Sequence, residues 1–134
     1  MRIFKITLAL NFRMEDGDTT LDQLKVLVSR FCEERNWTQY HKPKDLAIGV
    51  VTEAGELLDL FRFKTDQQVN EMMKDVRKRE QIGDELADVL YFIVRFAQLN
   101  GFDLSNEFVR KINKNRDKYP VESSKGSNRK YNKT

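Results

Sequence analysis

Residues 82–99 read Ile-Gly-Asp-Glu-Leu-Ala-Asp-Val-Leu-Tyr-Phe-Ile-Val-Arg-Phe-Ala-Gln-Leu, and this stretch decides the fold. Its apolar side chains fall on nearly every side of a helix, which is typical of a helix buried all round. Its longest apolar run, residues 86–99, contains Asp88 and Arg95 and is shorter than the roughly 20 residues that span a bilayer, so we expect a core helix and no membrane association. Because the helices of one short chain cannot surround it, we expect one face to pack on a second copy.

Capping signals and apolar spacing predict three more helices around this segment. Residues 19–22 (Thr-Thr-Leu-Asp) are typical of a helix start, and Pro43 suits the first turn of a second helix. The residue before Pro120 is disfavoured in helical geometry, which ends the last helix there. Thr65 can cap a charged stretch that either joins the apolar helix or forms a helix of its own. We therefore predict an all-α, four-helix-bundle-like fold that oligomerises through its apolar third helix, with helices at about residues 21–36, 43–63, 82–99 and 103–119.

The net charge of the chain is concentrated in its last residues. The 134-residue sequence has a net charge of +3 and a pI near 9.0, but the basic excess of residues 121–134 alone equals that net charge. The remainder has no overall excess to drive the phosphate binding of a dedicated DNA-binding protein, which argues against nucleic acid as a partner. We expect an amino-terminal arm of unassigned structure at residues 1–18, one helical domain at 19–120 and a disordered basic tail at 121–134.

The sequence favours a cytoplasmic protein. Its apolar first twelve residues are interrupted by Lys5 and lead into an acidic stretch without a small-residue cleavage site, which argues against a signal peptide. The single cysteine, Cys32, excludes an intrachain disulfide and suits a reducing compartment.

Two acidic pairs at i, i+3 spacing lie inside apolar helices. Glu53 and Glu56 fall in the second predicted helix, and Glu85 and Asp88 fall in the apolar one, so each pair shares one helical face. Carboxylates gathered in apolar surroundings are costly unless a cation neutralises them. All-oxygen ligation suits Mg²⁺, with Mn²⁺ as an alternative, and the absence of a nearby histidine does not fit a di-iron bundle.

The pattern alone leaves a second interpretation open. The acids can form the solvent-exposed stripe of two amphipathic helices, paired with Arg62, Lys64 or Arg95. A lone Glu-x-x-Glu favours this interpretation, whereas two such pairs, each inside an apolar helix, leave the two interpretations about equal. Evidence beyond the spacing is needed to separate them.

Four segments together resemble the MazG-like all-α nucleotide pyrophosphohydrolases, and most closely their dCTP pyrophosphatase branch. They are the two acidic motifs, the stretch from Trp37 to His41, and residues 111–120, which begin Lys-Ile-Asn-Lys-Asn-Arg. The resemblance covers about residues 20–120. The pair of acidic motifs is moderately specific by itself and strongly specific together with the Lys-x-x-x-Asn-Arg block.

The resemblance implies a metal-dependent hydrolase that acts on a nucleoside triphosphate. Glu53, Glu56, Glu85 and Asp88 would bind Mg²⁺, water would attack the α-phosphorus, and the products would be a nucleoside monophosphate and pyrophosphate. The physical logic agrees, because a metal neutralises phosphate charge and a nearby carboxylate can accept the proton of the water. A pyrimidine nucleotide such as dCTP is the first expectation, in a homodimer or a dimer of dimers.

The resemblance also implies which residues hold the substrate. Trp37 would stack on the base and His41 would form a hydrogen bond with it, although Trp37 can equally be a core residue. Lys111 and Asn115, four residues apart on one face of the last helix, would hold phosphate or ribose oxygens, and Arg116 would add positive charge. A basic last turn can also simply offset the helix dipole, and without the resemblance we would favour that interpretation.

Two positions depart from the pattern of the dCTP-specific relatives. Phe63 and Phe92 stand where those relatives carry a tryptophan and a tyrosine, so the base preference stays open. Phe63 can still stack on a base, but Phe92 has no hydroxyl, and one missing hydrogen bond can change discrimination by orders of magnitude. Tyr91 points about 100° away around the helix and cannot substitute for that hydroxyl.

Two other functions fit the sequence. One is a non-catalytic helical interaction module whose basic tail contacts nucleic acid or an acidic partner, with the carboxylates on its surface. The other is a related all-α enzyme with a different substrate, either dUTPase-like or a phosphoribosyl-ATP pyrophosphohydrolase. Nucleotide hydrolysis by a chain without its basic tail would exclude the interaction module. Substrate profiling separates the related enzymes from a dCTP pyrophosphatase.

Overall fold

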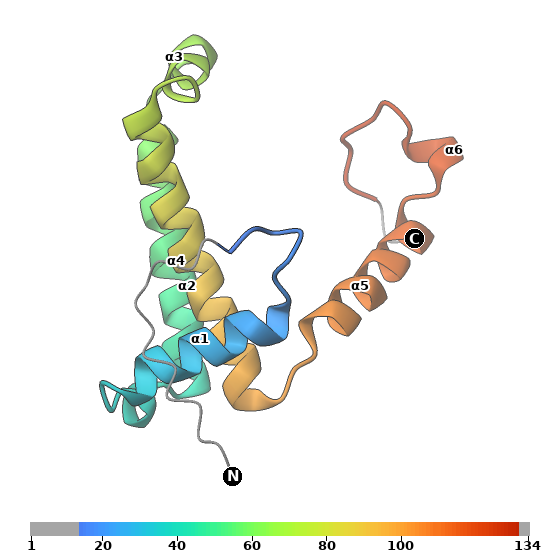
Figure 1. Ribbon diagram of the computed structural model, residues 1–134. Helices are drawn as coiled ribbons and strands as arrows, with labels where there is room; N and C mark the ends of the chain where they lie inside the picture. The colour runs from blue at the N-terminus through green and yellow to red at the C-terminus, as the bar shows by residue number, and fades with distance from the viewer. Residues whose placement is uncertain (1–13, 132–134) are drawn as a thin grey trace.

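The chain folds into helices joined by short connections (Figure 1). A computed structural model describes residues 14–131, and within that range there is no β-strand. The all-α prediction is therefore confirmed. The elements are α1 (Leu21–Glu33), the 3₁₀ turn η1 (Thr38–Tyr40), α2 (Pro43–Phe61), α3 (Asp66–Met72), α4 (Val76–Asn100), α5 (Leu104–Lys118) and α6 (Val121–Ser124).

Local capping chemistry sets most of the helix boundaries. Thr20 begins α1 and Thr65 begins α3, each through a reciprocal pair of hydrogen bonds with the glutamine three residues later. Asp75 accepts a hydrogen bond from the Lys78 amide and starts α4, so the charged stretch before residue 82 is divided between two helices. Gly101, with φ 71°, ends α4.

The centre of the fold is an antiparallel pair formed by α2 and α4, with α1 lying across α4 near one end (Figure 1). Close approach of the pair depends on Gly49, because a Cβ atom there would lie 2.4 Å from the Phe92 ring. The fully buried apolar residues gather at the end of the pair that meets α1, and they are Cys32, Leu46, Val94 and Ala97. The pair is therefore held together chiefly at that end.

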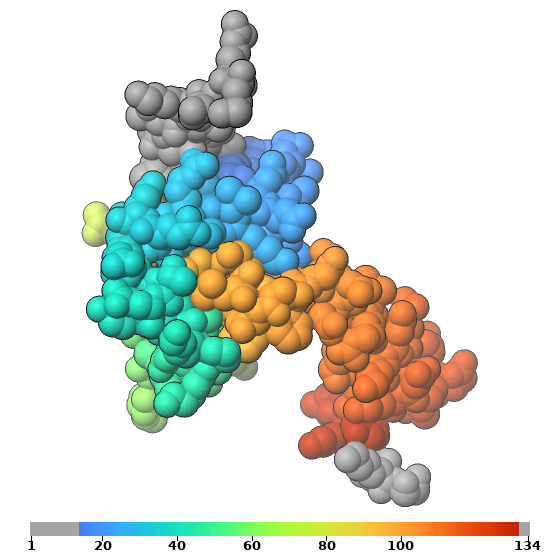
Figure 2. All heavy atoms as spheres, turned by 90° about the horizontal axis from the view of Figure 1, so that it is seen from below, coloured from blue at the N-terminus to red at the C-terminus, as the bar shows by residue number. Residues whose placement is uncertain are grey.

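Helix α5 does not close a four-helix bundle within one chain. It leaves the α2–α4 pair and extends as a separate arm (Figures 1 and 2). Its apolar face is open, since Phe108 is 69% exposed and Val109 is 58% exposed. Local sequence signals predicted the helix itself but not its direction.

Helix α4 has one face open within one chain, as expected for a helix that one short chain cannot surround. Leu86 and Leu90 are exposed on α4, as are Val51 and Leu58 on α2. Exposed large apolar side chains gathered on two packed helices are typical of an interface. Packing of this face on a second copy stays a prediction.

The two ends of the chain are described only in part. The amino-terminal arm expected at residues 1–18 lies mostly outside the described residues, and residues 16–18 form a turn. The tail expected to be disordered contains the short helix α6, and the Tyr131 ring packs 5.5 Å from that of Tyr119. Among residues 14–131, no helix has the length and apolarity needed to cross a bilayer.

Candidate functional site

Two stripes of side chains face each other along the α2–α4 pair. On α2 the stripe consists of Leu46, Gly49, Glu53 and Glu56, and on α4 it consists of Glu85, Asp88, Phe92 and Arg95. Spacings of three and four residues keep each stripe on one helical face. Because the helices are antiparallel, the acidic halves of the two stripes meet away from α1, and the other halves, which are apolar apart from Arg95, meet beside it. We refer to this contact as the α2–α4 seam.

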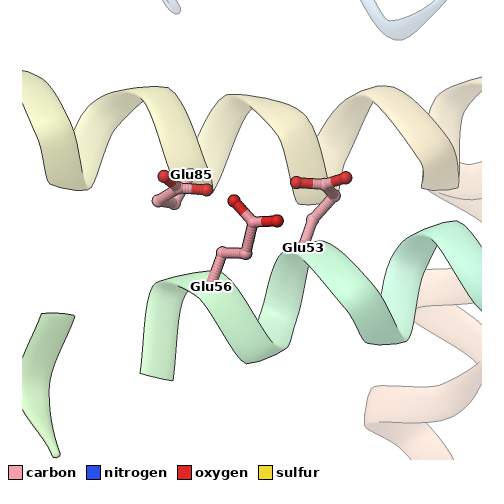
Figure 3. Close-up of side chains that lie close together, drawn as sticks. All are labelled: Glu53, Glu56 and Glu85. Carbon is pink, nitrogen blue, oxygen red and sulfur yellow. The ribbon is translucent and has the colours of Figure 1, made fainter. Parts of the chain in front are cut away.

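Three carboxylates converge in the acidic half of the seam. Glu53 and Glu56 project from α2 toward Glu85 on α4 (Figure 3). One oxygen from each of the three lies within 4.8 Å of the others, which is close enough for a single cation to contact all three. Glu53 and Glu85 are half-buried, and Glu56 is exposed. The seam therefore offers an open, all-oxygen ligand set.

The electrostatics of these groups are unfavourable without a cation. Desolvation, and then the charges of Glu56 and Asp88, raise the pKa of Glu53 above its ordinary value. The same causes, in the same order, raise the pKa of Glu85. One Glu85 oxygen, Oε2, is buried and has no hydrogen-bond partner. A buried carboxylate oxygen with neither donor nor counter-charge fits a site for a divalent metal ion.

Asp88 lies beside this cluster. Its charge acts on both Glu53 and Glu85, although the three converging oxygens do not include one of its own. The proposed surface pairings are not seen, since Arg62 binds Asp59 and neither Lys64 nor Arg95 forms an ion pair within residues 14–131. Of the two interpretations of the acidic pairs, a cation-binding cluster fits this geometry better than a solvent-exposed stripe.

The turn after α1 places His41 at the other end of the seam. The Arg95 guanidinium donates from Nε to His41 Nδ1 at 3.1 Å and from Nη2 to Thr38 Oγ1 at 2.9 Å. His41 is half-buried, whereas Trp37 at the start of the same turn is 41% exposed. Seven residues separate Asp88 from Arg95, so the helical rise puts about 10 Å between the acidic cluster and His41's contact with α4.

Phe92 lies in the seam between these two groups, and Tyr91 does not. The Phe92 ring packs over Gly49 on α2, while the Tyr91 hydroxyl lies 3.0 Å from Cys32 Sγ on α1. Burial and this contact with Cys32 raise the pKa of Tyr91. The expectation that Tyr91 cannot take the place of the Phe92 side chain therefore agrees with the structure.

Phe63 is not brought together with Trp37 and His41 in one chain. It follows the carboxyl end of α2, whereas Trp37 and His41 precede its amino end, and the helix between them is about 28 Å long. Phe63 has a left-handed backbone, with φ 62°, and its side chain is 92% exposed beneath the Arg62 guanidinium. A fully exposed phenylalanine in this conformation is uncommon.

The predicted phosphate-binding residues are also separate from the carboxylates in one chain. Lys111, Asn115 and Arg116 lie on α5, which extends away from the α2–α4 pair (Figure 1). Lys111 and Arg116 are exposed, and Asn115 is half-buried.

Arg95 is the residue whose role the sequence did not indicate. Its charge is typical of a surface partner for a carboxylate, but it is 1% exposed. The available signal was its spacing, because a residue seven positions after Asp88 returns to the same helical face.

Comparisons with known proteins agree on one family. Residues 48–133 match the MazG-like family. The dCTP pyrophosphatase 1 proteins of Rattus norvegicus and Homo sapiens are each 36% identical over 114 residues, which cover 85% of this chain and 67% of theirs. The crystal structure of a pyrophosphatase from Archaeoglobus fulgidus superposes with a TM-score of 0.70 and 27% identity, covering 81% of this chain and 99% of that one.

Proposed function

The chain belongs to the MazG-like family, and from this premise we propose that it cleaves a nucleoside triphosphate to the monophosphate and pyrophosphate at the α2–α4 seam. Its relatives are named as pyrophosphatases, so the chain is a hydrolase that acts on acid anhydrides. We propose dCTP or a related pyrimidine nucleotide as the substrate, because two relatives are named for dCTP. Removal of surplus or non-standard nucleotides is the role that fits this reaction.

The observation that carries the proposal is the convergence of Glu53, Glu56 and Glu85 around the buried, unpartnered Glu85 Oε2. We assign these three residues and Asp88 as ligands of Mg²⁺, with Mn²⁺ as a possible substitute. When bound, the ion supplies positive charge that offsets the phosphates and acidifies the attacking water. A carboxylate of the same cluster accepts the proton that the water loses.

The base is assigned to the opposite end of the seam. His41 lies there, and Trp37 begins the same turn, 41% exposed and with its ring against Phe31 on α1. Phe92 lines the interval of about 10 Å between the contact of His41 with α4 and the carboxylates. An extended nucleoside triphosphate is long enough to cover that interval. In this arrangement Trp37 stacks on the base and His41 forms a hydrogen bond with it.

The remaining predicted substrate-binding residues require a homo-oligomer to reach a substrate. The apolar surfaces of α2, α4 and α5 are open in one chain, and burying them requires a partner copy. Phe63 and the α5 residues Lys111, Asn115 and Arg116 lie away from the seam of their own chain. We propose that assembly as a dimer or a dimer of dimers brings these residues to a substrate.

The test is pyrophosphate release from a panel of dNTPs and NTPs, with Mg²⁺, with Mn²⁺ and with EDTA. We expect metal-dependent release with a pyrimidine ranked first. Glu53→Gln should abolish release, and Asp59→Asn is the matched control, because Asp59 lies on α2 but binds only Arg62. Equal release from Glu53→Gln and the unaltered protein would overturn the site assignment.

A further inference from the structure

Arg95 is a buried charge without an opposite charge beside it. It is 1% exposed, and none of the ion pairs seen within residues 14–131 includes it. Burial of a guanidinium beside neutral groups alone is more costly to folding than burial of an apolar side chain of similar volume. A contribution to the core alone therefore does not account for an arginine at this position.

Two of the three partners of Arg95 lie around one short turn. Its guanidinium donates to His41 Nδ1, to Thr38 Oγ1 and to Gln98 Oε1. Thr38 begins the turn η1 and His41 follows it, so one rigid, planar group holds both ends of the turn. Gln98 lies one turn further along α4 and fixes the guanidinium from the opposite side.

The hydrogen bond to His41 determines which imidazole nitrogen carries the proton. An arginine N–H can only donate, so His41 Nδ1 must accept and cannot be protonated. The neutral ring then carries its proton on Nε2. Partial burial, and then the positive charge of Arg95, lower the pKa of His41, which keeps the ring neutral at neutral pH.

We propose that Arg95 is a positioning residue that holds His41 in the Nε2–H tautomer, so that the turn presents a hydrogen-bond donor to the substrate base. This inference rests on the proposed function, in which His41 contacts the base. A donor at this position favours a base that offers an acceptor there, such as the unprotonated N3 of cytosine. The protonated N3 of uracil would face the same donor and be disfavoured.

The tautomer can be measured without substrate, because His41 is the only histidine of the chain. Protein labelled with ¹⁵N and freed of any histidine tag gives one pair of imidazole nitrogens in long-range proton–nitrogen correlation spectra. We expect a single Nε2–H tautomer in the unaltered protein at neutral pH. Detection of an Nδ1–H tautomer, alone or in a mixture, would overturn the proposal.

Arg95→Lys tests whether the guanidinium is the cause. Lysine keeps the charge but cannot reach three acceptors in the fixed geometry of a guanidinium. We expect a mixture of tautomers and a fall of about tenfold in the ratio of kcat/KM for dCTP to that for dUTP, the size expected from one hydrogen bond. Arg77→Lys, at an exposed arginine near the start of α4, is the matched control and should leave both readouts unchanged.

The two readouts separate this inference from the proposed function. If the unaltered protein hydrolyses no nucleotide, the proposed function fails, while the spectra still decide whether Arg95 fixes the tautomer. If Arg95→Lys keeps the single Nε2–H tautomer, the positioning role is wrong. If the tautomer changes and the ratio of kcat/KM values does not, Arg95 has no part in base selection.

Should Arg95→Lys fail to fold, two measurements still test the proposal. They are the spectrum of the unaltered protein and the ratio of kcat/KM for dCTP to that for dUTP in Thr38→Val, which removes one partner of Arg95.

Discussion

The contact between Gly49 and Phe92 gives the most direct prediction about the seam. A Cβ atom at Gly49 would lie 2.4 Å from both Cδ1 and Cε1 of Phe92 and 2.7 Å from Cγ. Carbon atoms in contact prefer about 3.5–4.0 Å, so Gly49→Ala requires a displacement of roughly 1 Å by the ring or by a whole helix. Overpacking of this kind costs about 1–3 kcal/mol, and the better helix propensity of alanine returns about 1 kcal/mol.

We therefore expect Gly49→Ala to lower the free energy of unfolding by about 2 kcal/mol, since the clash involves the body of the ring and falls at the upper end of that range. Gly83→Ala is the matched control, because a Cβ atom there has nothing within 4 Å. The free energy of unfolding of Gly83→Ala should be about 0.5–1 kcal/mol higher than that of the unaltered protein, from helix propensity alone. Urea denaturation followed by circular dichroism, at one fixed protein concentration, measures both changes.

A double-mutant cycle with Phe92→Leu assigns the effect to this pair. Leucine removes ring atoms that meet the new methyl group, so we expect a coupling energy of about 1–2 kcal/mol that partly restores Gly49→Ala. If Gly49→Ala proves as stable as the unaltered protein, the two helices are not in contact at Gly49. The distances within the carboxylate cluster would then be wrong as well, because the same contact sets the separation of α2 and α4.

Further predictions concern the carboxylates and His41. Asp88→Asn should abolish metal-dependent pyrophosphate release and leave the helical circular dichroism signal intact; full turnover would remove Asp88 from the site. The raised pKa values of Glu53 and Glu85 mean that the folded, metal-free protein binds protons more readily than the unfolded chain, so it should lose stability as pH rises above about 4.5. Glu85→Gln should reduce that loss in EDTA, and an unchanged pH profile of unfolding would contradict the electrostatic account. His41→Ala should alter the ranking of bases more than kcat, whereas equal losses for every base would exclude His41 as a reader of the base.

The sequence predicted the helices well because their boundaries depend on local chemistry. Thr20 and Thr65 form the expected caps, and α5 ends just before Pro120 as expected. These interactions join residues three or four positions apart, so they can be recognised without knowledge of the fold. The direction of α5 depends instead on the connection after Gly101 and on surfaces distant in sequence, and no local signal encodes it.

The candidate site divides in the same way. Helical spacing alone put Glu53 and Glu56 on one face, and the structure adds only that this face meets Glu85. The role of Arg95 is hard to predict because a single charge in an apolar helix indicates an interruption, although its spacing from Asp88 puts it in the seam. Its contact with His41 joins residues 54 positions apart and could not be inferred from either segment alone.

The two halves of the seam have opposite effects on the stability of the α2–α4 pair. At the α1 end, Leu46 and Val94 are buried to 0% and 1% exposure and hold the helices together through apolar contact. Beyond Gly49, like charges meet across the same pair, which favours separation of the helices. Packing in the apolar half fixes the distance between α2 and α4 in the acidic half. The carboxylates are therefore held closer together than they would be if the two helices were free to separate. A bound divalent cation would relieve this repulsion, so metal should stabilise the acidic half of the seam more than the apolar half. Hydrogen exchange with and without Mg²⁺ should accordingly show added protection at the amides around Glu53 and Glu85, and protection gained uniformly along α4 would argue against this division.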